Sequence, residues 1–242
     1  MAADDRRAAV VTGASSGIGR AVARALAPVA GHLCLVGRDE GRLADAAKEA
    51  RQHGAHVFPF LADLTCAQRV RELATEVEQR FGGLEILVHS AGSYARGDLR
   101  SASLQALDDQ YRANVRAPYE LTQVLLPALI RRQGDVVFLN STQGLSGTGG
   151  VGQFAATQHA TRAIADSLRA EVNALGVRVM TLHLGRTASP RQEHIHAMEG
   201  RAYEPQTLIQ PEDVADLVVA AVRLPKRAQV TTLTIWPTRR TT

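Results

Sequence analysis

Lysine, cysteine and aromatic residues are scarce in this chain, and each shortage argues against a class of protein. Of 242 residues only Lys48 and Lys226 are lysines, and 4% are aromatic. The arginines that carry most of the positive charge are scattered, without a dense basic run, so nucleic-acid binding is not expected despite the net charge of +4. The cysteines Cys34 and Cys66 have no metal-ligand spacing and no partner pattern, so neither a disulfide framework nor a metal site is predicted.

Long hydrophobic runs are also missing. No stretch of about 18 apolar residues occurs, so no transmembrane helix and no membrane partner are expected. The charged residues Asp4, Asp5, Arg6 and Arg7 replace the apolar region that a signal peptide needs. We therefore expect a cytoplasmic protein that acts on a small molecule.

Short apolar runs alternate with helical patterns along the whole chain. With 45% hydrophobic residues, this alternation predicts one α/β domain over residues 1–242, with a doubly wound, parallel, seven-stranded sheet and helices on both faces. The expected strands are 8–11, 33–36, 57–60, 86–89, 136–139, 177–183 and 233–235. The expected helices are 18–27, 41–53, 67–81, 104–132, 151–175 and 211–224. Residues 186–210 are polar and show no clear period, and we interpret them as a mobile lid over the substrate.

An apolar strand runs through a glycine-rich turn into a helix at residues 10–20, which read Val-Val-Thr-Gly-Ala-Ser-Ser-Gly-Ile-Gly-Arg. Gly13 permits the tight turn, Gly17 lets the backbone approach a ligand, and Gly19 lets the helix pack close to the strand. The helix N-terminus adds free N–H groups and a partial positive charge, so the stretch predicts a pyrophosphate site. The expected contacts in this turn are Gly13, Ser15, Ser16, Gly17, Ile18 and Gly19.

The spacing Thr-Gly-x-x-x-Gly-x-Gly resembles that of the short-chain dehydrogenase/reductase family, and the resemblance covers essentially the whole chain. It implies a Rossmann-like fold, a nicotinamide dinucleotide cofactor, and assembly into a homodimer or homotetramer through the helices 104–132 and 151–175. The resemblance also implies further cofactor contacts, which are Asp63 and Leu64 near the adenine, Ser90, Ala91 and Gly92 after the fourth strand, and Thr187 and Ser189 near the nicotinamide carboxamide.

Arg38 follows the second expected strand, where an acidic residue would bind a free adenosine ribose. A guanidinium matches phosphate geometry and keeps its charge, so Arg38 favours NADP(H) over NAD(H). The hydroxyls of Ser15 and Ser16 could add contacts to the same phosphate. The alternative interpretation is a solvated arginine at a strand end.

Members of the family use a Ser, a Tyr-x-x-x-Lys pair on one helix and often an Asn. Asn114 and Ser141 match this pattern and are the candidate catalytic residues, but Phe154 and Gln158 stand where the Tyr and Lys are expected. Phenylalanine has no proton to donate and glutamine has no charge, and loss of a positioned acid typically costs about 10²–10⁴ in rate. The usual mechanism therefore cannot operate here.

Few other residues qualify as a substitute acid. Tyr94 is the best candidate, and we assign it to the substrate pocket together with Phe154 and Gln158. His159 directly follows Gln158, so it points away from the helix face that meets the cofactor. His183 is expected to be a histidine of the core.

Three functions stay open at this stage. The favoured one is an NADP(H)-dependent oxidoreductase that reduces a carbonyl or quinone-type substrate, with Ser141 polarising the substrate and the proton coming from water or the substrate. The second is redox-neutral chemistry on the same fold, such as cyclisation, isomerisation or dehydration. The third is a non-catalytic NADP-binding protein or subunit. The substrate, and whether Phe154 and Gln158 are natural or engineered, stay open as well.

Overall fold

Seven parallel strands form one sheet in the computed structural model, which describes residues 7–238. The strand order is β3-β2-β1-β4-β5-β6-β7, which confirms the expected doubly wound sheet. The charged residues Asp4, Asp5 and Arg6 lie outside the described residues. The strands are β1 (Ala8–Thr12), β2 (His32–Gly37), β3 (His56–Leu61), β4 (Ile86–His89), β5 (Asp135–Ser141), β6 (Arg178–Leu184) and β7 (Thr232–Ile235).

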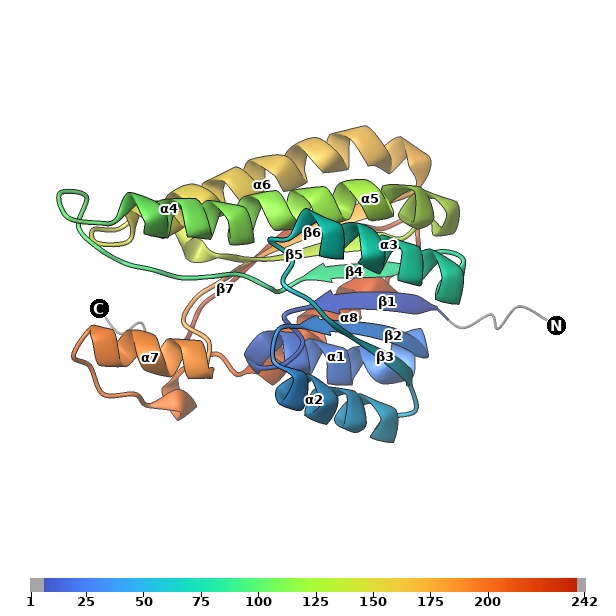
Figure 1. Ribbon diagram of the computed structural model, residues 1–242, viewed down its shortest axis with the longest axis horizontal. Helices are drawn as coiled ribbons and strands as arrows, with labels where there is room; N and C mark the ends of the chain where they lie inside the picture. Colours follow the sequence, from blue (N-terminus) through green and yellow to red (C-terminus); the bar gives the residue numbers. More distant parts are fainter. Residues whose placement is uncertain (1–6, 239–242) are drawn as a thin grey trace.

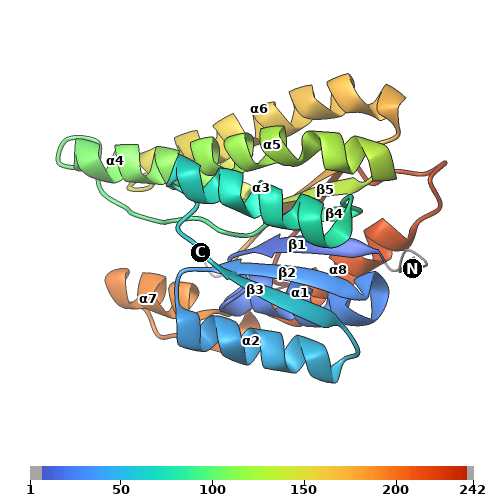
Figure 2. The same ribbon diagram turned by 45° about the vertical axis from the view of Figure 1, so that its right-hand side comes forward.

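Helices cover both faces of the sheet (Figures 1 and 2). One face carries α3, α5 and α6, and the other carries α1, α2 and α8, each group with its own hydrophobic core. None of the helices within residues 7–238 is long and apolar enough to cross a membrane. The bounds are α1 (Gly17–Ala30), α2 (Glu40–Gln52), α3 (Ala67–Phe81), α5 (Ala117–Arg132), α6 (Gly152–Val172) and α8 (Pro211–Arg223).

The periodic pattern of α3 shows why the sequence predicted this helix well. Val70, Leu73 and Val77 recur at helical spacing and are completely buried, while the charged residues between them face solvent. Gly82 ends the helix with a φ of 62°, a conformation that glycine adopts without strain. Strand β4 is equally clear, because all four of its side chains are buried between the two helical layers.

The single helix expected over 104–132 is interrupted. Helix α4 (Leu104–Tyr111) passes through a π-helical turn (Arg112–Arg116) before α5 begins. Pro118 has no N–H with which to bond the carbonyl of Asn114, and this carbonyl accepts instead from the Thr161 hydroxyl at 2.9 Å. Such a turn often marks a functional site, and this one carries Asn114.

The lid, residues 186–210, contains a helix that the sequence analysis did not predict. Helix α7 (Pro190–Met198) lies beyond the carboxyl ends of the strands (Figure 1), and a short 3₁₀ turn (Pro205–Thr207) follows it. The Ser189 hydroxyl accepts a hydrogen bond from the N–H of Gln192 at 3.1 Å, and Pro190 occupies the first helical position. The sequence analysis did not find this helix, because end signals rather than hydrophobic periodicity define it.

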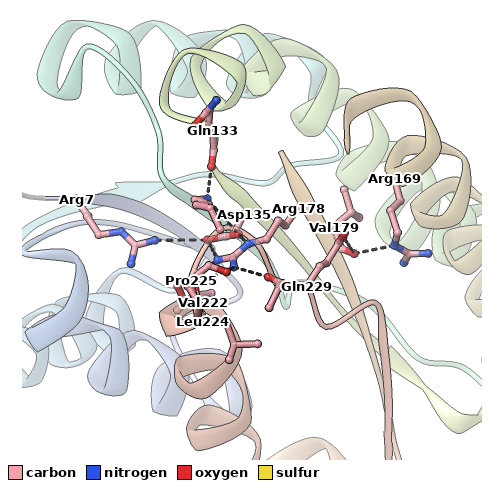
Figure 3. A network of polar contacts seen from close by, with 12 residues as sticks. Arg7, Gln133, Asp135, Arg169, Arg178, Val179, Val222, Leu224, Pro225 and Gln229 are labelled. Atoms are coloured by element: carbon pink, nitrogen blue, oxygen red, sulfur yellow. Dashed lines mark hydrogen bonds and ion pairs between the residues drawn. The ribbon is translucent and has the colours of Figure 1, made fainter. Parts of the chain in front are cut away.

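A buried ion-pair network closes the amino end of the sheet (Figure 3). Asp135 begins β5 and Arg178 begins β6, and Nε of Arg178 lies 2.5 Å from Oδ1 of Asp135. Arg7 and Lys226 approach the same carboxylate at 3.4 and 3.6 Å. Arg178 also donates hydrogen bonds to the carbonyl oxygens of Val222, Leu224, Pro225 and Ala228.

Candidate functional site

A cavity of about 900 Å³ opens at the carboxyl ends of the strands, the usual ligand position in a doubly wound sheet. It brings together every residue that the sequence analysis proposed for the cofactor, the substrate and catalysis, although their individual roles stay predictions. These residues are Gly13, Ser15, Ser16, Gly17, Ile18, Gly19, Arg38, Asp63, Leu64, Ser90, Ala91, Gly92, Tyr94, Asn114, Ser141, Phe154, Gln158, Thr187 and Ser189.

The glycine-rich turn has the geometry that a diphosphate needs. A Cβ on Gly13 would lie 2.8 Å from the backbone nitrogen of Ala91, and one on Gly19 would lie 2.3 Å from the carbonyl oxygen of Gly13. Only glycine allows such close packing. The side chain of Ser16, at the N-cap of α1, makes no capping hydrogen bond, so it leaves the N–H groups of the first turn for a ligand. A dinucleotide phosphate therefore fits this turn.

Arg38 stands at the cavity without a partner of its own. Within residues 7–238 its guanidinium makes no hydrogen bond or ion pair. The neighbouring Asp39 caps α2 and pairs with Arg42 at 3.2 Å. Asp63 accepts hydrogen bonds from Thr65 at 2.8 and 2.9 Å. The nearby carboxylates are thus engaged elsewhere, and Arg38 is left to bind an anion.

The pKa of Asp63 reflects this arrangement. Burial acts to raise it, but the two hydrogen bonds from Thr65 and the charge of Arg38 hold the pKa below its usual value. Asp63 is therefore a carboxylate at neutral pH, able to accept a hydrogen bond from an amino group.

Ser141 ends β5 with its hydroxyl in the cavity. The hydroxyl oxygen accepts the N–H of Gln143 at 3.1 Å, while its hydrogen has no acceptor within the described residues. The Oε1 of Gln158 accepts the backbone N–H of Ser141 at 3.1 Å. Gln158 thus fixes the segment that carries Ser141, and Ser141 keeps a donor for a substrate oxygen.

The side chain of Asn114 is fully engaged by the protein. Its Oδ1 accepts the N–H of Ser93 at 2.7 Å, and its Nδ2 donates to the carbonyl of Ser93 and to the Thr157 hydroxyl, both at 3.0 Å. These bonds tie the π-helical turn to the loop after β4 and to α6. They fix the side chain of Asn114 beside the cavity, and its catalytic role stays a prediction.

Tyr94 and Phe154 form an aromatic wall. Their ring centroids lie 5.0 Å apart in an edge-to-face arrangement, and both line the cavity. Burial and the nearby carboxylate of Glu199 raise the pKa of Tyr94 against the opposing charges of Arg96 and Arg186. The Tyr94 phenol therefore keeps its proton at neutral pH.

Three histidines near α6 and the cavity behave differently. His159 is exposed and does not line the cavity, in agreement with its expected orientation. His183 is buried, with Nδ1 3.2 Å from the carbonyl oxygen of Ser141 and Nε2 without a partner, and burial lowers its pKa. His89 lies at the cavity, where its Nε2 contacts the Thr122 hydroxyl at 2.8 Å and burial lowers its pKa to about 3.

Comparison with known proteins agrees with this site. A family model described as short chain dehydrogenase matches residues 7–200. The chain belongs to the short-chain dehydrogenase family. An uncharacterized oxidoreductase of Staphylococcus epidermidis is 30% identical over 98% of this chain and 100% of its own length.

Two solved structures extend the comparison. An alcohol dehydrogenase from the archaeon Thermococcus sibiricus, complexed with 5-hydroxy-NADP, is 27% identical, with a TM-score of 0.87 over 97% of this chain and 98% of that chain. A metagenomic short-chain oxidoreductase in complex with NADP is 25% identical, with a TM-score of 0.82 over 97% and 98% of the two chains.

In this short-chain dehydrogenase the cavity also contains residues that the sequence analysis missed. Arg42 lines it from the first turn of α2, and Arg191 lines it from the first turn of α7. Glu199 lines it as well and pairs with Arg186 at 2.7 Å and with Arg96 at 3.1 Å. The capping signal Ser189-Pro190 could have located the start of α7, and with it Arg191.

Proposed function

We propose that this chain is an NADP(H)-dependent oxidoreductase that interconverts a carbonyl or quinone-type substrate and its alcohol without a Tyr and Lys pair. The observation that carries the proposal is the cavity, which joins the glycine-rich turn and the unpaired Arg38 to the hydroxyl of Ser141. The NADP and 5-hydroxy-NADP of the two solved relatives add support for the cofactor.

Each part of the cavity has a distinct task in this proposal. The turn at Gly13–Gly19 and Arg38 hold the phosphates, and the bound cofactor supplies or accepts a hydride. Ser141 donates its hydroxyl hydrogen to the substrate oxygen and so stabilises the negative charge that develops there. Gln158 keeps Ser141 in place through the 3.1 Å hydrogen bond.

The absence of an acid at position 154 limits the substrates. Phe154 presents an apolar ring where relatives are expected to hold a phenol, so the proton comes from water or from an acidic hydroxyl of the substrate. An activated ketone or a quinone suits this arrangement, because its reduced oxygen is a weak base. A simple aliphatic ketone is a poor substrate for the same reason.

A binding function without chemistry is the second candidate. It is favoured by one observation, which is that the acceptor oxygens of both Asn114 and Gln158 are engaged by backbone N–H groups of the protein itself. The Ser141 hydroxyl and the protonated phenol of Tyr94 then distinguish the site from a pure binding pocket.

Calorimetric titration of the purified protein with NADPH and with NADH is the first test. We expect tight binding of NADPH and weaker binding of NADH, because only NADPH carries the 2′-phosphate that Arg38 binds. Failure to bind either dinucleotide would overturn the proposal and leave redox-neutral chemistry or a scaffold role.

The double substitution Phe154→Tyr with Gln158→Lys tests the mechanism. We expect it to raise the rate of simple ketone reduction by about 10²–10⁴, while the wild-type chain reduces only activated ketones and quinones. Phe154→Tyr alone is the control, because a phenol without a neighbouring ammonium group gains less. Equal rates on simple ketones for the wild-type and double variants would contradict the mechanism.

A further inference from the structure

Arg191, in the first turn of α7, lines the cavity and contacts the loop after β4. Its Nη2 donates a hydrogen bond to the carbonyl oxygen of Gly92 at 2.5 Å. A guanidinium has five N–H donors, and this is the only hydrogen bond or ion pair that Arg191 makes within residues 7–238. Most of its donors are therefore left for a ligand in the cavity.

No carboxylate of residues 7–238 pairs with Arg191. The carboxylate of Glu199 in the same lid is bonded to Arg186 and Arg96. The charged group that acts on Arg191 is another arginine, Arg38, and burial together with this repulsion holds the pKa of Arg191 below its usual value. Two guanidinium groups facing one cavity without acidic partners favour a ligand with more than one negative group.

The position of Arg191 relative to the glycine-rich turn indicates which group it meets. A Cβ on Gly17 would lie 3.3 Å from the Cβ of Ser189, so the turn and the N-cap of α7 face each other directly. Arg191 follows Ser189 by two residues and contacts Gly92, and a Cβ on Gly13 of the turn would lie 2.8 Å from the nitrogen of the adjacent Ala91. An anion held at the start of α1 would therefore lie near both the turn and the side chain of Arg191.

We propose that Arg191 is a diphosphate clamp: its guanidinium, on the lid, binds the diphosphate of the dinucleotide together with the glycine-rich turn. This inference rests on the proposed function, because it requires the cavity to hold NADP(H). The proposal assigns different phosphate groups to two arginines. Arg38 acts only on the 2′-phosphate of NADPH, whereas Arg191 acts on the diphosphate that NADPH and NADH share.

Substitution of Arg191→Ala tests this division by calorimetry with NADPH, NADH and 2′-AMP. We expect binding of both dinucleotides to weaken about 10- to 100-fold, the effect of losing charge-assisted hydrogen bonds, while 2′-AMP, which lacks a diphosphate, changes less than about twofold. Arg191→Lys keeps the charge but loses the two-pronged hydrogen bonding of a guanidinium. Its affinity for the dinucleotides should therefore fall between those of the wild-type chain and Arg191→Ala. Arg201→Ala removes an exposed lid arginine outside the cavity and is the matched control.

The outcomes separate the clamp from the proposed function. If the wild-type chain binds neither dinucleotide, the proposed function and the clamp are both overturned. If the wild-type chain binds NADPH and Arg191→Ala binds it equally well, only the clamp is overturned. A loss that affects NADPH and 2′-AMP but spares NADH would place Arg191 at the 2′-phosphate and overturn the diphosphate assignment.

Discussion

At the amino end of the sheet Arg178 meets the carboxylate of Asp135 and four backbone carbonyls, whereas at the carboxyl end Arg38 has no hydrogen bond or ion pair within residues 7–238. Both residues adjoin strands of the same sheet, and both carry the same charge. Arg178 is bonded within the protein, whereas the guanidinium donors of Arg38 stay available for the proposed anionic ligand. The presence or absence of a carboxylate partner thus separates the structural end of this molecule from its binding end.

The carboxyl end contains acidic side chains, but each is bonded elsewhere. Asp39 pairs with Arg42, Asp63 accepts from Thr65, and Glu199 pairs with three other arginines. Within residues 7–238 neither Arg38 nor Arg191 is hydrogen-bonded or ion-paired to a carboxylate, although the charge of Arg38 acts on Asp63. Both arginines line the cavity where the glycine-rich turn also offers N–H groups. The proposed anion binding therefore rests on the way the acids are distributed and not on an excess of basic residues.

Breaking the amino-end network should give the largest effect on stability. Arg178→Leu leaves the buried Asp135 and four carbonyls without their main donor, and we expect the free energy of unfolding to fall by about 3–5 kcal/mol. Urea denaturation of the wild-type and variant chains measures this change.

Arg24→Ala is the control for that experiment. Arg24 pairs with Glu212 at 2.7 Å, but both side chains are exposed, so its removal should cost less than about 1 kcal/mol. Equal losses for Arg178→Leu and Arg24→Ala would show that the amino-end network contributes no more than a surface ion pair.

Removing Arg38 should affect ligand binding and not stability, the opposite of removing Arg178. We expect Arg38→Ala to weaken NADPH binding about 10- to 100-fold and to leave NADH binding and the free energy of unfolding nearly unchanged, because the side chain makes no hydrogen bond or ion pair within residues 7–238. Calorimetry and urea denaturation on the same preparation measure both quantities.

Arg42→Ala is the matched control for Arg38. Arg42 lines the same cavity, but its guanidinium is already paired with Asp39. If Arg42→Ala abolishes the preference for NADPH and Arg38→Ala does not, the assignment of the 2′-phosphate to Arg38 is wrong.

The fold could be predicted because its signals are local and strong. Strand β4 and helix α3 begin and end where the apolar run and the helical period predict. The π-helical turn at Arg112–Arg116 could not be predicted by period alone, since it depends on Pro118 and on the tertiary contact of Thr161 with Asn114. Helix α7 was also not predicted, because its nine residues have no clear apolar face.

The candidate site was predictable as a set of residues but not as a network. The glycine-rich turn and the resemblance located the residues that line the cavity, including Arg38 and Ser141. The partners that decide what each group can do lie far apart in the chain, as when Gln158 accepts the N–H of Ser141 or Arg191 reaches Gly92. Such contacts follow from tertiary packing, which spacing along the sequence does not encode.

The smallest expected effect is the pH dependence of stability that comes from His89, a buried histidine at the carboxyl end of the sheet. His89 is buried, its ring stacks on Phe138 with centroids 4.7 Å apart, and burial lowers its pKa to about 3. Below about pH 6.5 the unfolded chain takes up a proton at this position that the folded chain refuses. Stability contributed by neutral His89 is therefore fully present above pH 6.5 and declines as the pH falls.

At pH 5 we expect this one group to lower the free energy of unfolding by about 2 kcal/mol relative to pH 7.5. His89→Asn should remove that part of the pH dependence of stability. A smaller pH dependence of the same sign should remain from His183, because burial lowers its pKa as well. Urea denaturation at both pH values measures the difference, with the exposed His194→Asn as control. An unchanged dependence in His89→Asn would mean that His89 can be protonated in the folded chain, and then the binding end would tolerate a third positive charge beside Arg38 and Arg191.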